Sequence, residues 1–183
     1  MLLAKLMLRA VGSVVLSILI AAAAHADGLV RELRIGGLVH DMPGMWSGFT
    51  YETHTIDVNL EALLASGLPV LGGVLRPAVG GTINTRGDTS HAYVDARWEI
   101  ELPYRLFAGV GLGAAVHNGH IGPDSPTAKA FGSRVLFHVP AEIGIRLDQH
   151  NSLSVYFEHT SNADIASLNE GMDRLGVRYG YRF

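Results

Sequence analysis

Apolar and polar residues alternate along most of this chain, in runs of about ten residues separated by turns. Residues 153–158 show the pattern clearly, because Leu153, Val155 and Phe157 share one parity and the residues between them share the other. Successive side chains of a β-strand point to opposite faces, so a period of two predicts a strand with one apolar face.

Eight such runs occur, and helical periodicity is hard to find anywhere between them. The runs cover residues 29–39, 48–60, 73–84, 90–102, 104–117, 131–147, 152–161 and 173–183. Beyond the first residues of the chain, no segment reaches the 18 consecutive apolar residues of a helical membrane span. The pattern predicts an all-β fold of eight antiparallel strands.

The polar face of these runs indicates where the apolar face points. In 90–102 it carries acids and Arg97, and in 104–117 it carries Gly109, Gly111 and Gly113. Charges of both signs, interleaved with glycine, can pair inside a narrow barrel while the apolar face meets lipid. We therefore predict a transmembrane β-barrel, with Arg134, Glu142 and Arg146 facing the interior and Leu153, Val155 and Phe157 facing lipid. A secreted, lipocalin-like barrel with the two faces reversed is the alternative.

Residues 1–26 have the organisation of a cleaved secretory signal peptide. Lys5 and Arg9 precede an apolar stretch, and Ala24-His25-Ala26 is an A-x-A cleavage site. An uncleaved transmembrane anchor is the alternative, but the stretch is short of the ~20 residues that a spanning helix needs. Residues 27–183 then form one barrel domain. Cleavage would remove two of the 14 basic residues and none of the 17 acidic ones, so the net charge moves from −3 to about −5.

An even number of strands places both ends of the chain on the periplasmic side, and longer loops tend to lie outside. The connections at 40–47, 85–89, 118–130 and 162–172 are then external. We expect Glu61–Gly72 to be a long periplasmic connection, packed under the barrel through Leu63, Leu64 and Leu68.

Polar residues end the apolar stripe of the seventh run and begin that of the eighth. His159 and Ser161 continue the face of Phe157, and Asp173 opens the apolar face of 173–183. If the two runs pair as a hairpin, the three side chains are neighbours on the lipid-facing side, at the outer end of the barrel. Alternate residues of a strand lie roughly 6.5–7 Å apart, close enough for a hydroxyl to reach an imidazole.

A hydroxyl, an imidazole and a carboxylate in this order form the nucleophile, base and orienting acid of a serine hydrolase. Asn162 and Asn169, in or beside the intervening loop, are candidate oxyanion donors. Glu170 is the rival acid, but it belongs to the loop and has the wrong parity.

The same residues carry a resemblance to a known family. His159-Thr160-Ser161-Asn162-Ala163, Asn169-Glu170-Gly171-Met172-Asp173 and the terminal Tyr181-Arg182-Phe183 resemble the outer-membrane lipid A 3-O-deacylases, also called acyloxyacyl hydrolases. The resemblance implies an eight-stranded barrel that hydrolyses the ester-linked acyl chain at position 3 of lipid A in lipopolysaccharide, in the outer leaflet of the bacterial outer membrane. It implies Ser161 as nucleophile, His159 as base and Asp173 as acid, where some members have Glu.

Other chemistry is poorly supported by the sequence. Gly80-Gly81-Thr82 and the glycines of 109–113 lack the strand-to-helix context of a phosphate loop, and the nine histidines show no metal-ligand spacing. We expect no cofactor, no metal and, given the net negative charge, no nucleic acid partner; the expected partners are lipid A and outer-membrane lipid. The chain has no cysteine, which excludes thiol catalysis and disulfides.

Several residues remain as candidate substrate contacts. His40, Asp41 and Trp46 of the first external loop could line a substrate groove, and Lys129 and Arg174 could bind lipid A phosphates. The alternative function is a non-catalytic small outer-membrane barrel, an adhesin or a structural protein, which would leave the mass of lipid A unchanged.

Overall fold

A computed structural model describes residues 28–47, 52 and 55–183 of the chain. The predicted signal segment and the first residues of the run that was expected to begin at 48 lie outside the described residues. The elements are β1 (Val30–Val39), β2 (Ile56–Leu64), β3 (Leu68–Val70), β4 (Gly73–Asn84), β5 (His91–Glu101), the short 3₁₀ turn η1 (Pro103–Arg105), β6 (Leu106–His117), β7 (Val135–Arg146), β8 (Asn151–Ser161) and β9 (Met172–Arg182).

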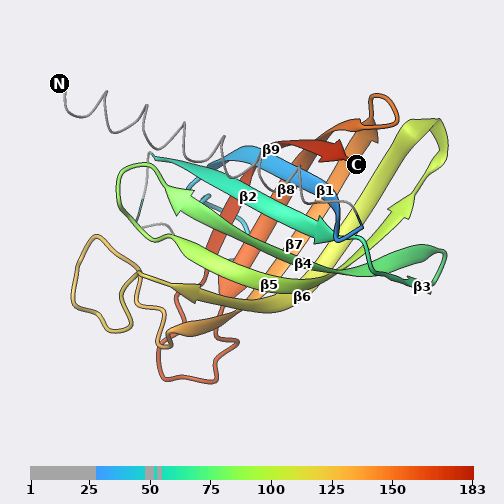
Figure 1. Cartoon of the computed structure of the whole chain (residues 1–183). Helices are drawn as coiled ribbons and strands as arrows, with labels where there is room; N and C mark the ends of the chain where they lie inside the picture. The colour runs from blue at the N-terminus through green and yellow to red at the C-terminus, as the bar shows by residue number, and fades with distance from the viewer. Residues whose placement is uncertain (1–27, 48–51, 53–54) are drawn as a thin grey trace.

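Eight of these strands close an antiparallel barrel (Figure 1). Neighbours in sequence pair along the sheet, β1 pairs with β9, and a pairing between β2 and β4 completes the circle. The short β3 only extends the edge of β4 beyond this circle. The predicted eight-stranded antiparallel β-barrel is confirmed.

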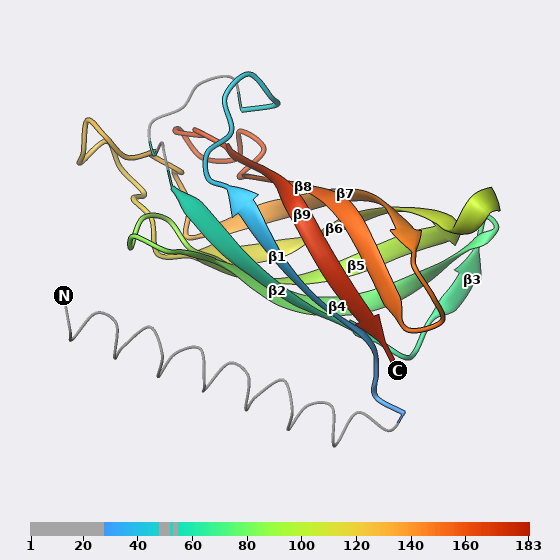
Figure 2. The ribbon, with the colours of Figure 1, turned by 90° about the horizontal axis from the view of Figure 1, so that it is seen from above.

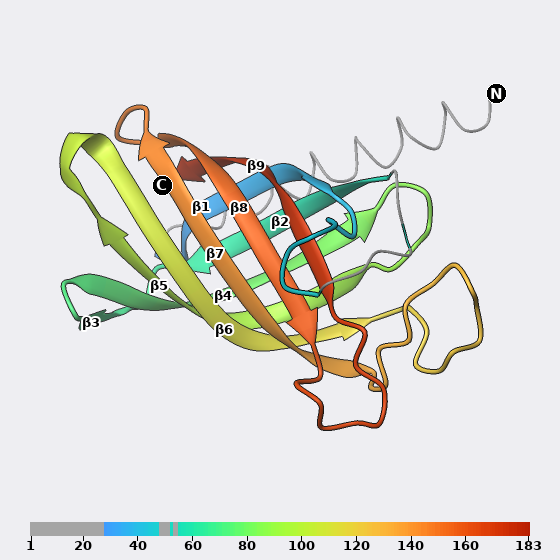
Figure 3. The same ribbon diagram turned by 180° about the vertical axis from the view of Figure 1, so that it is seen from behind.

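The two ends of the barrel differ (Figure 3). Connections after β1, β4, β6 and β8 gather at one end, which we call the loop end. The other end, the turn end, carries the short connections, the start of β1 and the C-terminus, because Glu32 pairs with Arg182 there. No helix within the described part of the chain is long and apolar enough to cross a membrane.

Apolar side chains cover the outside of the barrel. Val94, Val110, Leu153 and Val155 are each about half exposed, and they alternate with buried polar or aromatic residues or, in β6, with glycines. A protein in water would bury these residues instead, so their outward orientation suits contact with lipid. The predicted orientation of Leu153, Val155 and Phe157 is confirmed.

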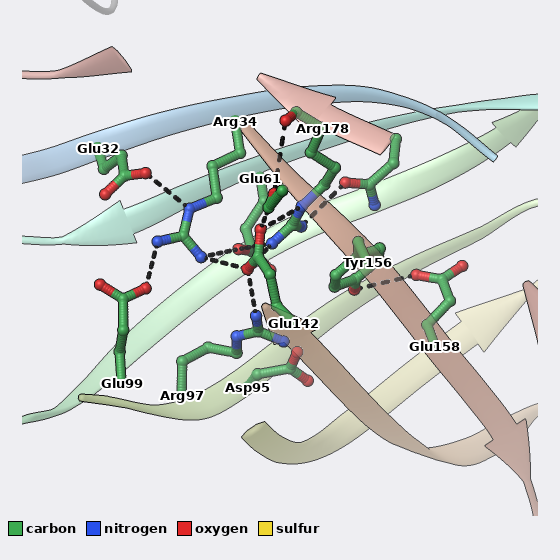
Figure 4. Close-up of polar contacts among 12 residues, drawn as sticks. Glu32, Arg34, Glu61, Asp95, Arg97, Glu99, Glu142, Tyr156, Glu158 and Arg178 are labelled. Carbon is green, nitrogen blue, oxygen red and sulfur yellow. Dashed lines mark hydrogen bonds and ion pairs between the residues drawn. The ribbon is translucent and has the colours of Figure 1, made fainter. Parts of the chain in front are cut away.

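The interior is filled by a network of ion pairs (Figure 4). Glu142 accepts from Arg34 at 2.6 Å and from Arg97 at 2.9 Å, and it also pairs with Arg178. Arg178 in turn lies over the ring of Tyr156, with 3.6 Å from its Cζ atom to the ring centre. Charges buried this deeply need partners, since an unpaired one would cost several kcal/mol.

Glycines on the inward face of β6 make room for this network. A Cβ atom at Gly111 would lie 2.7 Å from Cδ of Arg97, and one at Gly113 would lie 2.0 Å from Oδ1 of Asp95. The glycines of 104–117 therefore allow large charged side chains of β5 to fold across the neighbouring strand.

Two sequence predictions are wrong in this part of the molecule. β2 continues to Leu64, so Leu63 is buried inside the barrel rather than packed beneath it, and Leu68 of β3 is exposed. The connection from β2 to β4 therefore begins at residue 65, and it contains β3 and a two-residue turn with positive φ at Leu71 and Gly72. Arg134 lies just before β7, is exposed, and donates to the carbonyls of His117 and Gly119. Glu142 and Arg146 are buried inside, as predicted.

Candidate active site

The β8–β9 hairpin brings the predicted cluster together. His159 and Asp173 are directly opposite in the register, and Ser161 ends β8 two residues further on. Nδ1 of His159 lies 2.6 Å from Oδ1 of Asp173, and Nε2 of the same ring lies 2.9 Å from Oγ of Ser161. The carboxylate can only accept, so Nδ1 carries a proton, and in the neutral ring Nε2 is free to accept from the hydroxyl.

The cluster is sheltered rather than open to lipid, which corrects the sequence expectation. His159 is 4% exposed and Asp173 is fully buried, while Ser161 remains partly exposed. Trp46 of the first loop stacks on His159, with 4.3 Å between ring centres and 13° between ring planes. Ser47 donates to Oδ2 of Asp173 from its backbone N–H at 2.6 Å and from its hydroxyl at 2.9 Å.

The two asparagines hold the loop between β8 and β9. Nδ2 of Asn162 donates both hydrogens, to the carbonyls of Phe131 and Leu168, so it has none to offer an oxyanion. Asn169 accepts from the backbone N–H of Asn162 and donates one hydrogen to Asp164. The contacts therefore do not support the predicted oxyanion role for the Asn162 side chain. For Asn169, only one of the two side-chain N–H groups has a partner among the described residues.

Glu170, the alternative candidate for the acid, hydrogen-bonds to the backbone of another loop. Its Oε2 accepts from the backbone N–H of Ala130 at 2.7 Å, and its own N–H donates back to the carbonyl of Ala130. These contacts join the loop after β8 to the loop after β6. Asp173 is the carboxylate that contacts His159.

Two of the three first-loop candidates are not placed for substrate contact. His40 lies buried between Asp57 at 2.7 Å and Glu52 at 3.0 Å, and Asp41 is buried beside Lys129. Burial opposes protonation of His40, but the hydrogen bonds to the two carboxylates prevail and raise its pKa. Burial would likewise raise the pKa of Glu52, but hydrogen bonds from His40 and Thr89 lower it to about 2. Only Trp46 of the three reaches the cluster.

Lys129 and Arg174, the predicted phosphate ligands, are both fully buried. The ammonium of Lys129 contacts Asp41 at 2.6 Å and the carbonyl of Gly171 at 2.5 Å. Arg174 faces the barrel interior and donates to Asp57. Neither can reach a phosphate at the surface, so this expectation is wrong.

An apolar groove of about 350 Å³ lies near Ser161, because the next residue, Asn162, is part of its wall. It is lined by residues of β6, β7 and the loop after β8, among them Ala114, Phe137, Asn162 and Ile165. Phe137, another residue of the groove wall, pairs with Ser161 in the register of β7 and β8.

A second histidine cluster lies inside the barrel, where His91, His138 and Glu158 offer three ligand atoms within 4.8 Å of one another. Both nitrogens of His138 face carboxylates, of Asp95 at 2.9 Å and of Glu158 at 3.2 Å, so both can donate only when the ring is an imidazolium. Arg174 can only donate, so its contact with Nδ1 of His91 leaves that ring's proton on Nε2. Neither histidine then has a free lone pair for a metal ion, so we interpret the cluster as a salt-bridge network.

Sequence reasoning missed Ser47 entirely, because an isolated serine in a loop carries no local signal of its tertiary partner. The aromatic Trp46 was visible as a loop residue, but its position over His159 depends on how the first loop folds back onto β8 and β9.

Comparison with known proteins identifies one family and one fold. A sequence model of the lipid A 3-O-deacylase (PagL) family matches residues 80–182, more than half of the chain and all of the cluster on β8 and β9. The crystal structure of the outer membrane enzyme PagL superposes with a TM-score of 0.59 at 16% identity, covering 84% of this chain and 99% of that one. A de novo designed transmembrane β-barrel superposes at 0.52 with 15% identity, covering 85% and 96%. No curated protein matches the sequence significantly.

Proposed function

Because the chain belongs to the lipid A 3-O-deacylase (PagL) family, we propose that it is an outer-membrane serine esterase that hydrolyses the ester-linked acyl chain at position 3 of lipid A. The observation that carries the mechanism is the continuous hydrogen-bonded chain from Asp173 through His159 to Ser161. In this proposal Ser161 is the nucleophile, His159 the general base and Asp173 the orienting acid.

In the acylation step, Oγ of Ser161 attacks the ester carbonyl carbon and its proton passes to Nε2 of His159. Asp173 holds the ring in the tautomer that can accept this proton and stabilises the resulting imidazolium. The tetrahedral intermediate then expels the 3-oxygen of the sugar, which takes the proton from His159 and leaves as an alcohol. The acyl chain remains on Ser161 as an ester.

Deacylation repeats these roles with water as the nucleophile. His159 takes a proton from the water as it attacks the acyl carbon, and then returns a proton to Oγ of Ser161. The net reaction consumes one ester and one water and yields a fatty acid and an alcohol. The remaining N–H of Asn169 is our candidate donor to the oxyanion in both steps.

The surroundings of Ser161 suit a lipid substrate. The apolar groove near Ser161 would hold an acyl chain, and the flanking outer surface of the barrel is apolar. We propose that the loop end faces outward and sets the cluster at the level of the outer leaflet, where lipid A resides. Removal of residues 1–26 as a signal peptide, leaving 27–183 as the barrel domain, belongs to the same proposal.

Lipid A mass tests this function directly. Cells or proteoliposomes containing the protein are expected to yield lipid A that is lighter by one hydroxyacyl chain. A fluorophosphonate probe should label the folded protein, and peptide mass spectrometry should place the label on Ser161. Unchanged lipid A mass, together with labelling absent or at another residue, would reject the proposal in favour of a non-catalytic barrel.

A further inference from the structure

The first loop, residues 40–47, is fastened to the proposed acid at three points. The backbone N–H of Met42 donates to the carbonyl of Asp173 at 2.8 Å, and Ser47 donates twice to the carboxylate of the same residue. Figure 2 shows this loop folded back beside the loop that joins β8 to β9. The contacts bring Trp46 and Ser47 onto the two members of the cluster that do not attack the substrate.

We propose that Trp46 and Ser47 are positioning residues of the hydrolytic site, Trp46 by stacking on the imidazole of His159 and Ser47 by fixing the carboxylate of Asp173. The inference rests on the proposed function, since it assigns these residues a part in the same reaction. Both lie outside residues 80–182, the part of the chain that matches the family.

Ser47 completes the hydrogen bonding of a carboxylate that has no access to water. Oδ1 of Asp173 faces His159, and Oδ2 receives the two donors of Ser47. Without them Oδ2 would be a buried, unsatisfied acceptor, which is costly, and the carboxylate could rotate away from the ring. The pair of donors therefore fixes the plane in which Asp173 meets Nδ1 of His159.

Trp46 acts on the charge that appears during the reaction. His159 is neutral before attack and becomes an imidazolium when it takes the proton of Ser161. The face of an indole carries negative potential and attracts a cation more strongly than a neutral ring. A stack at 4.3 Å with nearly parallel rings therefore favours the charged state, and an interaction made mainly in the transition state changes kcat rather than KM.

A buried cation holds this arrangement. The ammonium of Lys129 contacts Asp41 at 2.6 Å and Ser47 at 3.4 Å in the first loop, and the carbonyl of Gly171 at 2.5 Å in the loop after β8. Because Lys129 comes from the loop after β6, it joins three loops of the loop end around Asp173. The position of Trp46 and Ser47 is thus set by the fold of the loop end as a whole.

Kinetics on purified, folded full-length protein with lipid A in detergent test the proposal. Trp46→Leu keeps an apolar cover but removes the π face, and should lower kcat by about 3- to 30-fold with KM near that of the wild type. Trp46→Phe should recover most of this loss. Ser47→Ala should lower kcat by about tenfold, and Ser47→Thr, which restores a hydroxyl, should recover most of it.

Fluorescence anisotropy tests the stack without reference to activity. The chain has two tryptophans, and Trp98 lies at the turn end, where its indole donates to Val70. In a Trp98→Phe background, emission from Trp46 should show high anisotropy that falls when His159→Ala removes the ring beneath it. An anisotropy unaffected by His159→Ala would overturn the stacking.

The kinetic outcomes separate the two proposals. If Trp46→Leu and Ser47→Ala both keep the wild-type kcat while Ser161→Ala is inactive, the positioning role is wrong and the hydrolase stands. If Trp46→Leu raises KM with kcat unchanged, Trp46 is a substrate contact and the positioning role is again wrong. If Ser161→Ala is as active as the wild type, the proposed function itself fails.

Discussion

Strand β8 carries a histidine–carboxylate cluster on each of its faces. On the outer face His159 faces one carboxylate, of Asp173, and one hydroxyl, of Ser161. On the inner face Glu158 meets His138, whose other nitrogen faces Asp95. Both clusters combine a histidine with carboxylates, and β8 contributes Glu158 to the inner one and the adjacent His159 to the outer one.

What differs is the second partner of the histidine. When both nitrogens of a histidine donate to carboxylates, as in His138, the ring is an imidazolium and has no lone pair with which to take a proton. A ring between a carboxylate and a hydroxyl has an acceptor nitrogen aimed at a nucleophile. Ser161 is partly exposed, and its neighbours Phe137 and Asn162 line an apolar groove, whereas Glu158 is fully buried. Residue type therefore says little about catalysis until partners and access are known.

The largest expected effect lies on the outer face. Ser161→Ala or His159→Asn should abolish release of the acyl chain, a loss of several orders of magnitude, because either change removes the nucleophile or the base. The barrel should still assemble, since neither residue belongs to the interior network. Lipid A mass after reaction, with heat-modifiable gel migration as the control for folding, checks both statements. Wild-type release by well-folded Ser161→Ala would refute the assignment.

Glu158→Gln should lower the stability of the barrel while leaving the activity of the folded protein largely intact. The change is nearly isosteric but leaves the charges of His138 and Arg174 short of a partner inside the barrel, which should destabilise the fold by about 3–5 kcal/mol. The folded fraction should still deacylate lipid A. Urea unfolding in detergent measures the first effect, with Ser161→Ala as the matched control of unchanged midpoint. Equal midpoints for the two variants would show that the inner cluster is not structural.

The proposed acid can be tested against its rival in the loop. Asp173→Asn should lower activity by about 10³–10⁴-fold because an amide permits the wrong tautomer of His159. Asp173→Glu should keep a substantial part of the activity. Glu170→Gln should cost far less, because its side-chain carbonyl can still accept from Ala130. Rates of the three folded variants on lipid A in detergent decide the matter, and an inactive Glu170→Gln beside an active Asp173→Asn would reverse the assignment.

The smallest expected effect is the pH dependence of the stability that His40, at the start of the first loop, contributes. The raised pKa of His40 means that its hydrogen bonds to Asp57 and Glu52 stabilise the fold fully below its ordinary pKa of about 6.5, and that this contribution is lost as the pH rises through the higher folded value. The gap in thermal midpoint between wild type and His40→Asn should therefore be widest near pH 6 and narrow toward alkaline pH.

Lowering the pH should also reduce the difference in thermal midpoint between the wild type and His40→Asn, but for a different reason. The pKa of Glu52 is lowered to about 2, so its contribution is present above its ordinary value of about 4.5 and is lost as the pH falls toward 2. A difference in thermal midpoint that stays constant from pH 2 to pH 9 would show that protonation of this pair does not contribute to stability.

The alternation of residues determined most of the fold. A period of two fixed the strands, and acids, arginines and glycines sharing one parity showed that polar side chains face inward and apolar ones outward. Parity also placed His159, Ser161 and Asp173 on one face, because residues that are directly opposite in two paired antiparallel strands point to the same face of the sheet. These are local or near-neighbour properties, which a sequence carries directly.

Only the tertiary structure decided what covers that cluster and what occupies the loop end. The contacts of Trp46 and Ser47 with β8 and β9, and the burial of Lys129 between three loops, join residues that are distant in sequence and share no strand register. Loops follow no repeating pattern, so their side chains find partners through the packing of the whole end of the barrel. For that reason Lys129 looks like a surface cation in the sequence and is buried between three loops in the molecule, whereas the inward position of Arg174 follows from its parity in β9.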